Sequence, residues 1–161
     1  MYEFMAALED SGLGRAMRES GVWTYGIVNL THILGVSTLF GSVLLPDLRL
    51  LGVWNRIDLK AITRPTVPVA TTGFFVAAAS GVCLIATNAT EYVENPFLYV
   101  KFSAIAVGVA NIAILRFVPA WKEHDKRLLL ERENRHLKIA AAISLLCWFT
   151  AVTAGRMIGY W

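Results

Sequence analysis

Apolar residues fall in long, nearly uncharged runs along this chain, separated by short segments that collect the charges. The first run, from Val22 to Leu45, contains no Asp, Glu, Lys or Arg. It is long enough to cross a hydrocarbon core of about 30 Å at about 1.5 Å per residue. Three more runs predict three more crossings, and the expected spans are about residues 22–45, 66–87, 97–118 and 137–160. The pattern therefore predicts an all-α integral membrane four-helix bundle, a single transmembrane domain over residues 1–161.

The segment before the first span has a weaker, helical pattern. Met1, Phe4, Met5 and Leu8 share one helical face, and Ser11-Gly12 then interrupts the pattern. We expect residues 1–21 to form an N-terminal interfacial amphipathic helix, in one or two pieces, with a frayed tail as the alternative. Acidic residues and the lack of a long apolar core argue against a cleaved signal peptide, so we expect the first span to direct insertion.

Prolines supply a second signal for the boundaries. All five lie at or beyond the ends of the expected spans, where helix-breaking residues belong: Pro46, Pro65, Pro68, Pro96 and Pro119. The segment after Pro46 suits an interfacial loop or short helix, residues 88–96 a polar turn, and residues 121–138 a charged hairpin. No strand is expected.

Composition agrees with a membrane protein and excludes several function classes. Of 161 residues, 56% are hydrophobic and 17% charged, with a mean hydropathy of +0.53. Cys83 and Cys147 lie in separate apolar runs, where we expect them to pack as buried thiols. The chain has no glycine-rich phosphate loop, HExxH, GxSxG or cysteine-based metal motif. We therefore expect no catalytic residue, no metal site and no nucleic-acid partner.

The basic residues predict an orientation. Four of the 15 lie on one side of the expected bundle, and the remaining 11 lie on the other side, most of them in the charged hairpin. The positive-inside rule places the richer side in the cytoplasm, so both termini are expected in the periplasm of a bacterial inner membrane. The hairpin is then expected to attract anionic lipids.

His32 is the first candidate for a functional site, because an ionisable residue inside a membrane is costly and usually functional. Asn29 lies one helical turn earlier, on the same face. In one interpretation His32 is a neutral imidazole hydrogen-bonded within the bundle, its partner drawn from Asn29, Asn111, Ser103 or Thr150. In another, His32 and Asn29 form a proton or small-ligand site of a transporter or channel.

A third interpretation makes His32 an axial ligand of a b-type haem, as in other four-helix membrane cytochromes. The other histidines, His124 and His136, lie in or beside the charged hairpin, and Met157 lies near the opposite surface. A second axial ligand would then come from a partner or a symmetry mate. Whether haem is bound stays open at this point.

Charged residues at the span ends form a second candidate, an interfacial charge site. Their expected role is ion pairing and snorkelling that fix helix depth, with a lipid or partner site as the alternative. The residues are Asp47, Arg49, Lys101, Arg116 and Arg156.

Four stretches together resemble a known family: Thr31–Gly52 (THILGVSTLFGSVLLPDLRLLG), Thr71–Leu84 (TTGFFVAAASGVCL), Asn95–Asn111 (NPFLYVKFSAIAVGVAN) and Ser144–Tyr160 (SLLCWFTAVTAGRMIGY). They are similar to the DUF6644 type of small bacterial four-span membrane proteins and, more distantly, to CopD-like and cytochrome b561-like bundles. The resemblance implies a bacterial inner-membrane bundle and no known activity. The residues matching its pattern are His32, Asp47, Arg49, Lys101, Asn111, Gly155 and Arg156.

Gly73, Ala77 and Gly81 form a small-residue stripe on the second span, suited to close helix contact. With this stripe and no complete site, we expect a non-catalytic membrane protein that acts as an oligomer or as an accessory subunit of a membrane complex. Electron transfer through haem is the alternative, and a small transporter or channel using His32 and Asn29 is the third.

Overall fold

The computed structural model describes residues 1–115, 117 and 131–161 of the chain. In these residues the secondary structure is helical, without a strand. The elements in chain order are α1 (Tyr2–Glu9), α2 (Gly12–Glu19), α3 (Gly21–Leu51), α4 (Leu59–Thr87), the 3-10 turn η1 (Ala89–Tyr92), α5 (Pro96–Leu115), α7 (Glu131–Met157) and the 3-10 turn η2 (Ile158–Tyr160).

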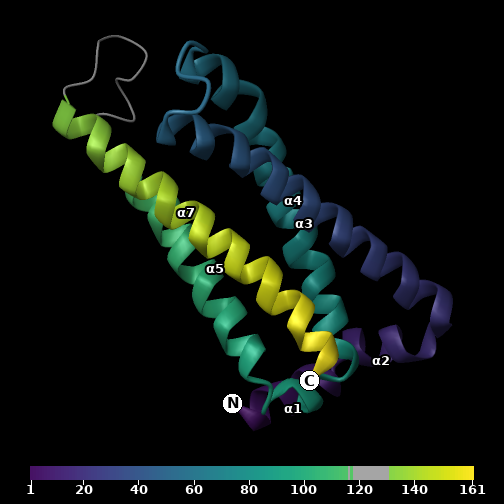
Figure 1. The fold of residues 1–161 in the computed structure, drawn as a ribbon. Helices are drawn as coiled ribbons and strands as arrows, with labels where there is room; N and C mark the ends of the chain where they lie inside the picture. The colour runs from purple at the N-terminus through teal and green to yellow at the C-terminus, as the bar shows by residue number, and fades with distance from the viewer. Residues whose placement is uncertain (116, 118–130) are drawn as a thin grey trace.

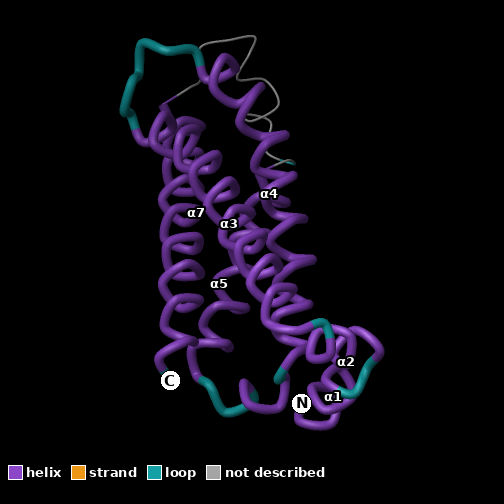
Figure 2. The backbone as a smooth tube through the Cα atoms, turned by 90° about the vertical axis from the view of Figure 1, so that its right-hand side faces the viewer, coloured by secondary structure: helices purple, strands orange, loops and turns teal. Residues whose placement is uncertain are grey.

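Helices α3, α4, α5 and α7 run side by side as a bundle (Figure 1). Each is long and apolar enough to cross a membrane, which confirms the predicted four-helix membrane fold. Helix α3 packs along α4, α5 packs along α7, and the contact of α3 with α7 joins the two pairs. Both termini lie at the same end of the bundle, as an even number of crossings requires (Figures 1 and 2).

Glycines allow α3 and α4 to approach closely. A Cβ atom at Gly73 would lie 2.6 Å from the backbone nitrogen of Leu39, and one at Gly35 would lie 2.7 Å from that of Ala77. Backbone atoms cannot move aside as a flexible side chain can, so a larger residue at either position would force the two helices apart. Gly73 and Ala77 of the small-residue stripe are therefore buried within the chain, against α3.

The helix ends follow their local sequence. Helix α3 ends at Leu51 and is capped by Gly52, whose φ of +110° is the left-handed conformation that glycine adopts readily. Helix α5 begins at Pro96, and the side-chain oxygen of Asn95 accepts a hydrogen bond from the Phe97 backbone N–H at 3.0 Å. Proline at the first helical position after an asparagine cap is a typical helix start.

The expectation that every proline marks a helix end is wrong for three of the five. Pro46 lies inside α3, and Pro65 and Pro68 lie inside α4. A proline removes one backbone hydrogen bond, and long helices in a bundle tolerate this loss because neighbouring helices and Ser/Thr side chains compensate. As a result α3 continues to Leu51, and the connection to α4 is only a short turn.

The N-terminal segment forms two short helices that pack on the end of the bundle (Figure 2). The Glu9 carboxylate accepts hydrogen bonds from the Thr90 backbone N–H at 2.8 Å and from its hydroxyl at 2.7 Å. These bonds lower the pKa of Glu9 below its usual value. Arg18 donates a hydrogen bond to the Thr87 carbonyl at 3.1 Å, so polar contacts fix both helices to the bundle.

The predicted hairpin over residues 121–138 lies largely outside the described residues, as does the end of the third expected span. Its last part, from Glu131, forms the first turns of α7. His124 and Arg116 are likewise outside the described part of the chain.

Candidate functional site

His32 is held against α4. Its Nδ1 lies 2.9 Å from the Ala77 carbonyl oxygen and 3.2 Å from the Ser80 hydroxyl. A carbonyl oxygen only accepts hydrogen bonds, so Nδ1 carries the proton and Nε2 is left as an acceptor. A Cβ atom at Gly81 would lie 3.0 Å from the imidazole Cε1, and this glycine therefore makes room for the ring.

The structure does not bring the predicted polar set of Asn29, His32 and Asn111 together. Asn111 on α5 donates a hydrogen bond to the Ala140 carbonyl of α7 at 2.9 Å. Asn29 is exposed on α3 and makes no hydrogen bond with any other residue that the structure describes. The bundle thus provides partners for His32 and Asn111 on different helices and leaves Asn29 facing outward.

The residues of the predicted interfacial charge site also separate. The Lys101 side chain of α5 lies over Gly155, with Nζ 3.4 Å from where a Cβ would be. Arg156 stacks on the Tyr160 ring, 4.6 Å from its centroid, and donates a hydrogen bond to its hydroxyl. Neither cation forms an ion pair within the described residues.

Asp47 and Arg49 point in different directions although only one residue separates them. Arg49 donates hydrogen bonds to the carbonyls of Ile57 at 2.5 Å and Asn55 at 2.8 Å, and so holds the turn after α3. Asp47 is turned into the bundle, where only 7% of it is exposed. It is therefore a buried acid in the structure, turned away from the position of Arg49.

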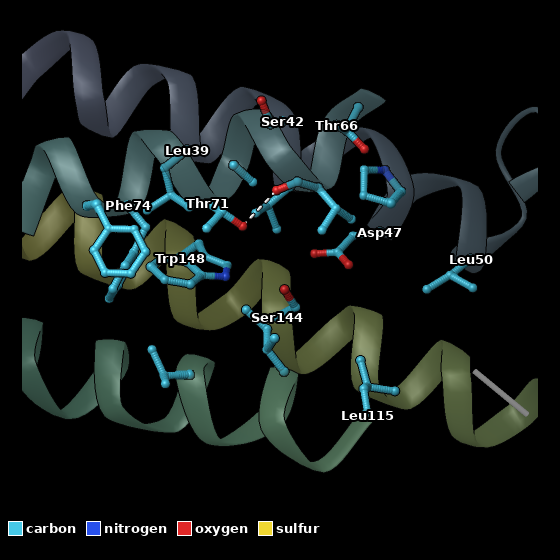
Figure 3. Close-up of a pocket in the computed structure, with 17 residues that line it drawn as sticks. Leu39, Ser42, Asp47, Leu50, Thr66, Thr71, Phe74, Leu115, Ser144 and Trp148 are labelled. Carbon is cyan, nitrogen blue, oxygen red and sulfur yellow. Dashed lines mark hydrogen bonds between the residues drawn. The ribbon is translucent and has the colours of Figure 1, made fainter. Parts of the chain in front are cut away.

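Asp47 lines a partly open cavity of about 310 Å³ to which all four long helices contribute residues (Figure 3). Ser144 of α7 lines the same cavity (Figure 3). Carboxyl oxygen Oδ2 of Asp47 and indole nitrogen Nε1 of Trp148 are both buried without a hydrogen-bond partner. Figure 3 shows the indole nitrogen on the edge of the ring that faces Asp47.

The remainder of the cavity wall is mostly apolar. Its other residues are Leu39, Ser42, Val43, Pro46 and Leu50 of α3; Thr66, Val67, Ala70, Thr71, Phe74 and Phe75 of α4; and Val109, Ile112 and Leu115 of α5. The ring of Phe74 meets that of Trp148 edge to face, with 6.4 Å between centroids. An unpaired donor and an unpaired acceptor at one end of an apolar cavity make this the best-defined candidate site in the described chain.

Sequence reasoning missed Ser80, Ser144 and Trp148, and it did not predict that Asp47 is buried in a cavity. The signal for Asp47 was available: if α3 is continued past Pro46, residue 47 falls beside the buried positions Leu39 and Leu50. Ser144 and Trp148 are four residues apart, so they share one face of α7.

No group of three or more His, Cys, Asp or Glu in the described residues could hold a metal ion.

Comparison with known proteins identifies the family. The family of unknown function DUF6644 matches residues 4–161, nearly the whole chain. The chain belongs to the DUF6644 family. No curated protein and no solved structure matches it, so the more distant resemblance to CopD-like and cytochrome b561-like bundles is not confirmed. Four helices long and apolar enough to cross a membrane make this DUF6644 chain a multi-pass membrane protein.

Proposed function

We propose that this chain is a non-catalytic membrane protein that binds a small, largely apolar molecule in the cavity at Asp47. We further propose that it acts as an oligomer or as an accessory subunit of a membrane complex. The observation that carries the binding function is the pair of unpartnered buried atoms, Asp47 Oδ2 and Trp148 Nε1. Each such group costs about 1–3 kcal/mol, so a structure that retains two in one cavity favours a bound group that pairs with them.

Filling the cavity tests this function. Ala70 lines the cavity, so Ala70→Phe places a ring in the space that the ligand would occupy. Ala106 is exposed on α5, so Ala106→Phe makes the same change on the outer surface and serves as the matched control. We expect an apolar aryl diazirine to photolabel cavity residues in the wild type and in Ala106→Phe, and to lose this labelling in Ala70→Phe. Equal cavity labelling in all three proteins would contradict the proposal.

Assembly with other subunits draws support from Asn29. Trp23 and Tyr25 are exposed near the start of α3, as in an aromatic belt, and Asn29 lies four to six residues further into the bilayer. An amide both donates and accepts hydrogen bonds, so Asn29 can pair with the same residue of a second copy across a two-fold axis. The small-residue stripe no longer supports this proposal, because Gly73 and Ala77 pack on α3.

Molar mass in detergent, measured by light scattering, tests assembly. We expect a dimer or larger oligomer for the wild type and a shift toward monomer for Asn29→Leu. Ser37→Leu, at another exposed position of α3, is the control and should leave the mass unchanged. A monomeric wild type would rule out assembly through copies of this chain.

Electron transfer through a b-type haem is the second candidate, favoured by one observation. The Nδ1–H of His32 is bonded to a backbone carbonyl, which is the usual orientation of a ligating histidine and directs Nε2 away for a metal. His136 is exposed near the start of α7, at the end of the bundle away from the two termini. The described residues of one chain therefore do not supply two histidine ligands for one haem. A His32-dependent haem band in a reduced-minus-oxidised spectrum would establish this function, and a colourless protein would remove it.

We also propose a topology with both termini in the periplasm of a bacterial inner membrane. Arg49, Arg56, Lys60 and Arg64 lie at or near the turn between α3 and α4, opposite the termini, which supports a cytoplasmic position for that end and contact with anionic lipids. Labelling of single cysteines at residues 2 and 55 with an impermeant reagent in intact cells tests it: only residue 2 should react.

A further inference from the structure

We infer that the ligand of the Asp47 cavity is an uncharged aromatic hydroxyl compound, a phenol or hydroquinone ring, whose hydroxyl donates a hydrogen bond to Asp47 and accepts one from Trp148. This inference rests on the proposed binding function and adds the chemical class of the ligand.

The hydrogen-bonding capacity of the cavity selects the polar group. Indole nitrogen Nε1 of Trp148 can only donate, and carboxylate oxygen Oδ2 of Asp47 accepts. A hydroxyl group satisfies both at once. It does so in either protonation state of Asp47, because its oxygen has one proton to donate and lone pairs to accept with, whereas an ammonium group has no lone pair for the indole N–H and an ether or ketone has no proton for an ionised Asp47.

The neighbouring hydroxyls do not alter this selection. The Thr71 hydroxyl donates its proton to the Val67 carbonyl at 2.9 Å, and the Thr66 hydroxyl donates to the Ile62 carbonyl at 2.8 Å. Both protons are used within α4, so these groups offer the cavity only lone pairs. Trp148 Nε1 is therefore the buried donor without a partner in this cavity, and the Ser42 hydroxyl, which can both donate and accept, is compatible with a hydroxyl ligand as well.

The apolar part of the cavity selects the body of the ligand. A volume of about 310 Å³ lies at the lower end of small-molecule sites, so it suits a single substituted ring better than a sterol or a lipid with two chains. Phe74 and Trp148 meet edge to face on one wall, and aromatic rings favour further contacts of this kind.

The route of entry suits a molecule dissolved in the bilayer. Phe75 of α4 and Val109 of α5 both line the cavity, and 65% and 42% of their surfaces are exposed. These helices are not among the closely packed pairs of the bundle. The exposed lining residues of α4 and α5 therefore point to an opening between these helices, where a lipid-soluble phenol or the ring of a membrane quinol can enter.

A matched pair of photoreactive probes tests the ligand class: a trifluoromethyl-diazirinyl phenol and its methyl ether, applied to the full chain in lipid nanodiscs. The two probes differ in whether the oxygen can donate a hydrogen bond. A hydrogen bond to a charged group corresponds to roughly a tenfold or greater change in affinity. We therefore expect the phenol to label cavity residues at about tenfold lower concentration than the ether.

Two substitutions assign the effect to the named atoms. Trp148→Phe removes the donor and keeps a ring, and Asp47→Asn keeps the shape of the side chain while removing the charge. We expect each to remove most of the advantage of the phenol over the ether, whereas Ser37→Ala on the outer surface of α3 should not change it. Competition by thymol and by duroquinol then distinguishes a free phenol from a quinol ring, and competition by either supports the class.

The outcomes separate the inference from the proposed function. If both probes label the cavity equally, the cavity binds ligands but the hydroxyl assignment is wrong. If neither probe labels the cavity, the proposed binding function fails as well. Labelling by the phenol that persists unchanged in both Trp148→Phe and Asp47→Asn would overturn the inference even if the cavity is occupied.

Discussion

The close contact between α3 and α4 allows a quantitative test of the fold. In Gly73→Ala the new Cβ would lie 2.6 Å from the Leu39 nitrogen, whereas ordinary contacts begin at 3.4 Å. The helices would have to separate locally by the difference, about 0.8 Å. Overpacking of this kind costs about 1–3 kcal/mol. Alanine also favours the helix over glycine by roughly 1 kcal/mol, which partly hides that cost.

Gly41→Ala is the matched control because a Cβ there meets nothing within 4 Å. It gains the same helix propensity on the same bundle without a clash, so the difference between the two variants isolates the packing cost. We expect Gly73→Ala to have a free energy of unfolding about 1–3 kcal/mol below that of Gly41→Ala, measured by circular dichroism during SDS titration in mixed micelles. Equal stability of the two variants would refute the described packing of α3 on α4.

Three further substitutions test contacts elsewhere in the chain. The hydrogen bonds from Thr90 lower the pKa of Glu9 in the folded protein below its value in the unfolded chain. The ionised Glu9 therefore stabilises the fold at pH values above the unfolded pKa, and this stabilisation is lost as the pH falls through the folded pKa. The wild type should therefore exceed Glu9→Gln in thermal stability at neutral pH and lose its advantage in acid; a pH-independent difference would contradict this. Asn111→Leu removes the hydrogen bond to Ala140 and should cost about 0.6–2 kcal/mol in the same SDS titration, whereas no loss would show that the bond contributes nothing. Arg49→Lys cannot reach both carbonyls of the turn after α3, so hydrogen exchange over residues 52–58 should accelerate in mass spectrometry, and unchanged exchange would argue against this role.

Hydropathy predicted the helices well because membrane crossing depends on length and composition, which are local properties of the sequence. It did not predict how far each helix continues. Pro46 was interpreted as the end of the first span, but a packed bundle tolerates a proline inside a helix. Because α3 continues past Pro46, Asp47 lies on a helix and lines a cavity, which the expected loop did not predict.

The contacts of the polar residues were harder to predict than the helices. His32 bonds to the carbonyl of Ala77, and every residue carries a carbonyl, so no side-chain pattern in the sequence marks that partner. The small-residue stripe correctly indicated close helix contact, but its partner proved to be α3 of the same chain. Which helices pair depends on the arrangement of the whole bundle, which the residues of one span do not reveal.

The central claim, that the cavity holds a ligand at Asp47 and Trp148, is tested most directly by the indole N–H resonances of the 15N-labelled protein in nanodiscs. The chain has five tryptophans, and Trp148→Phe assigns the resonance of Trp148. On titration with thymol, we predict that the Trp148 N–H proton moves downfield as it gains an acceptor, while the other four resonances stay in place, and that Asp47→Asn weakens this response. A Trp148 resonance that does not move at saturating thymol would contradict the account.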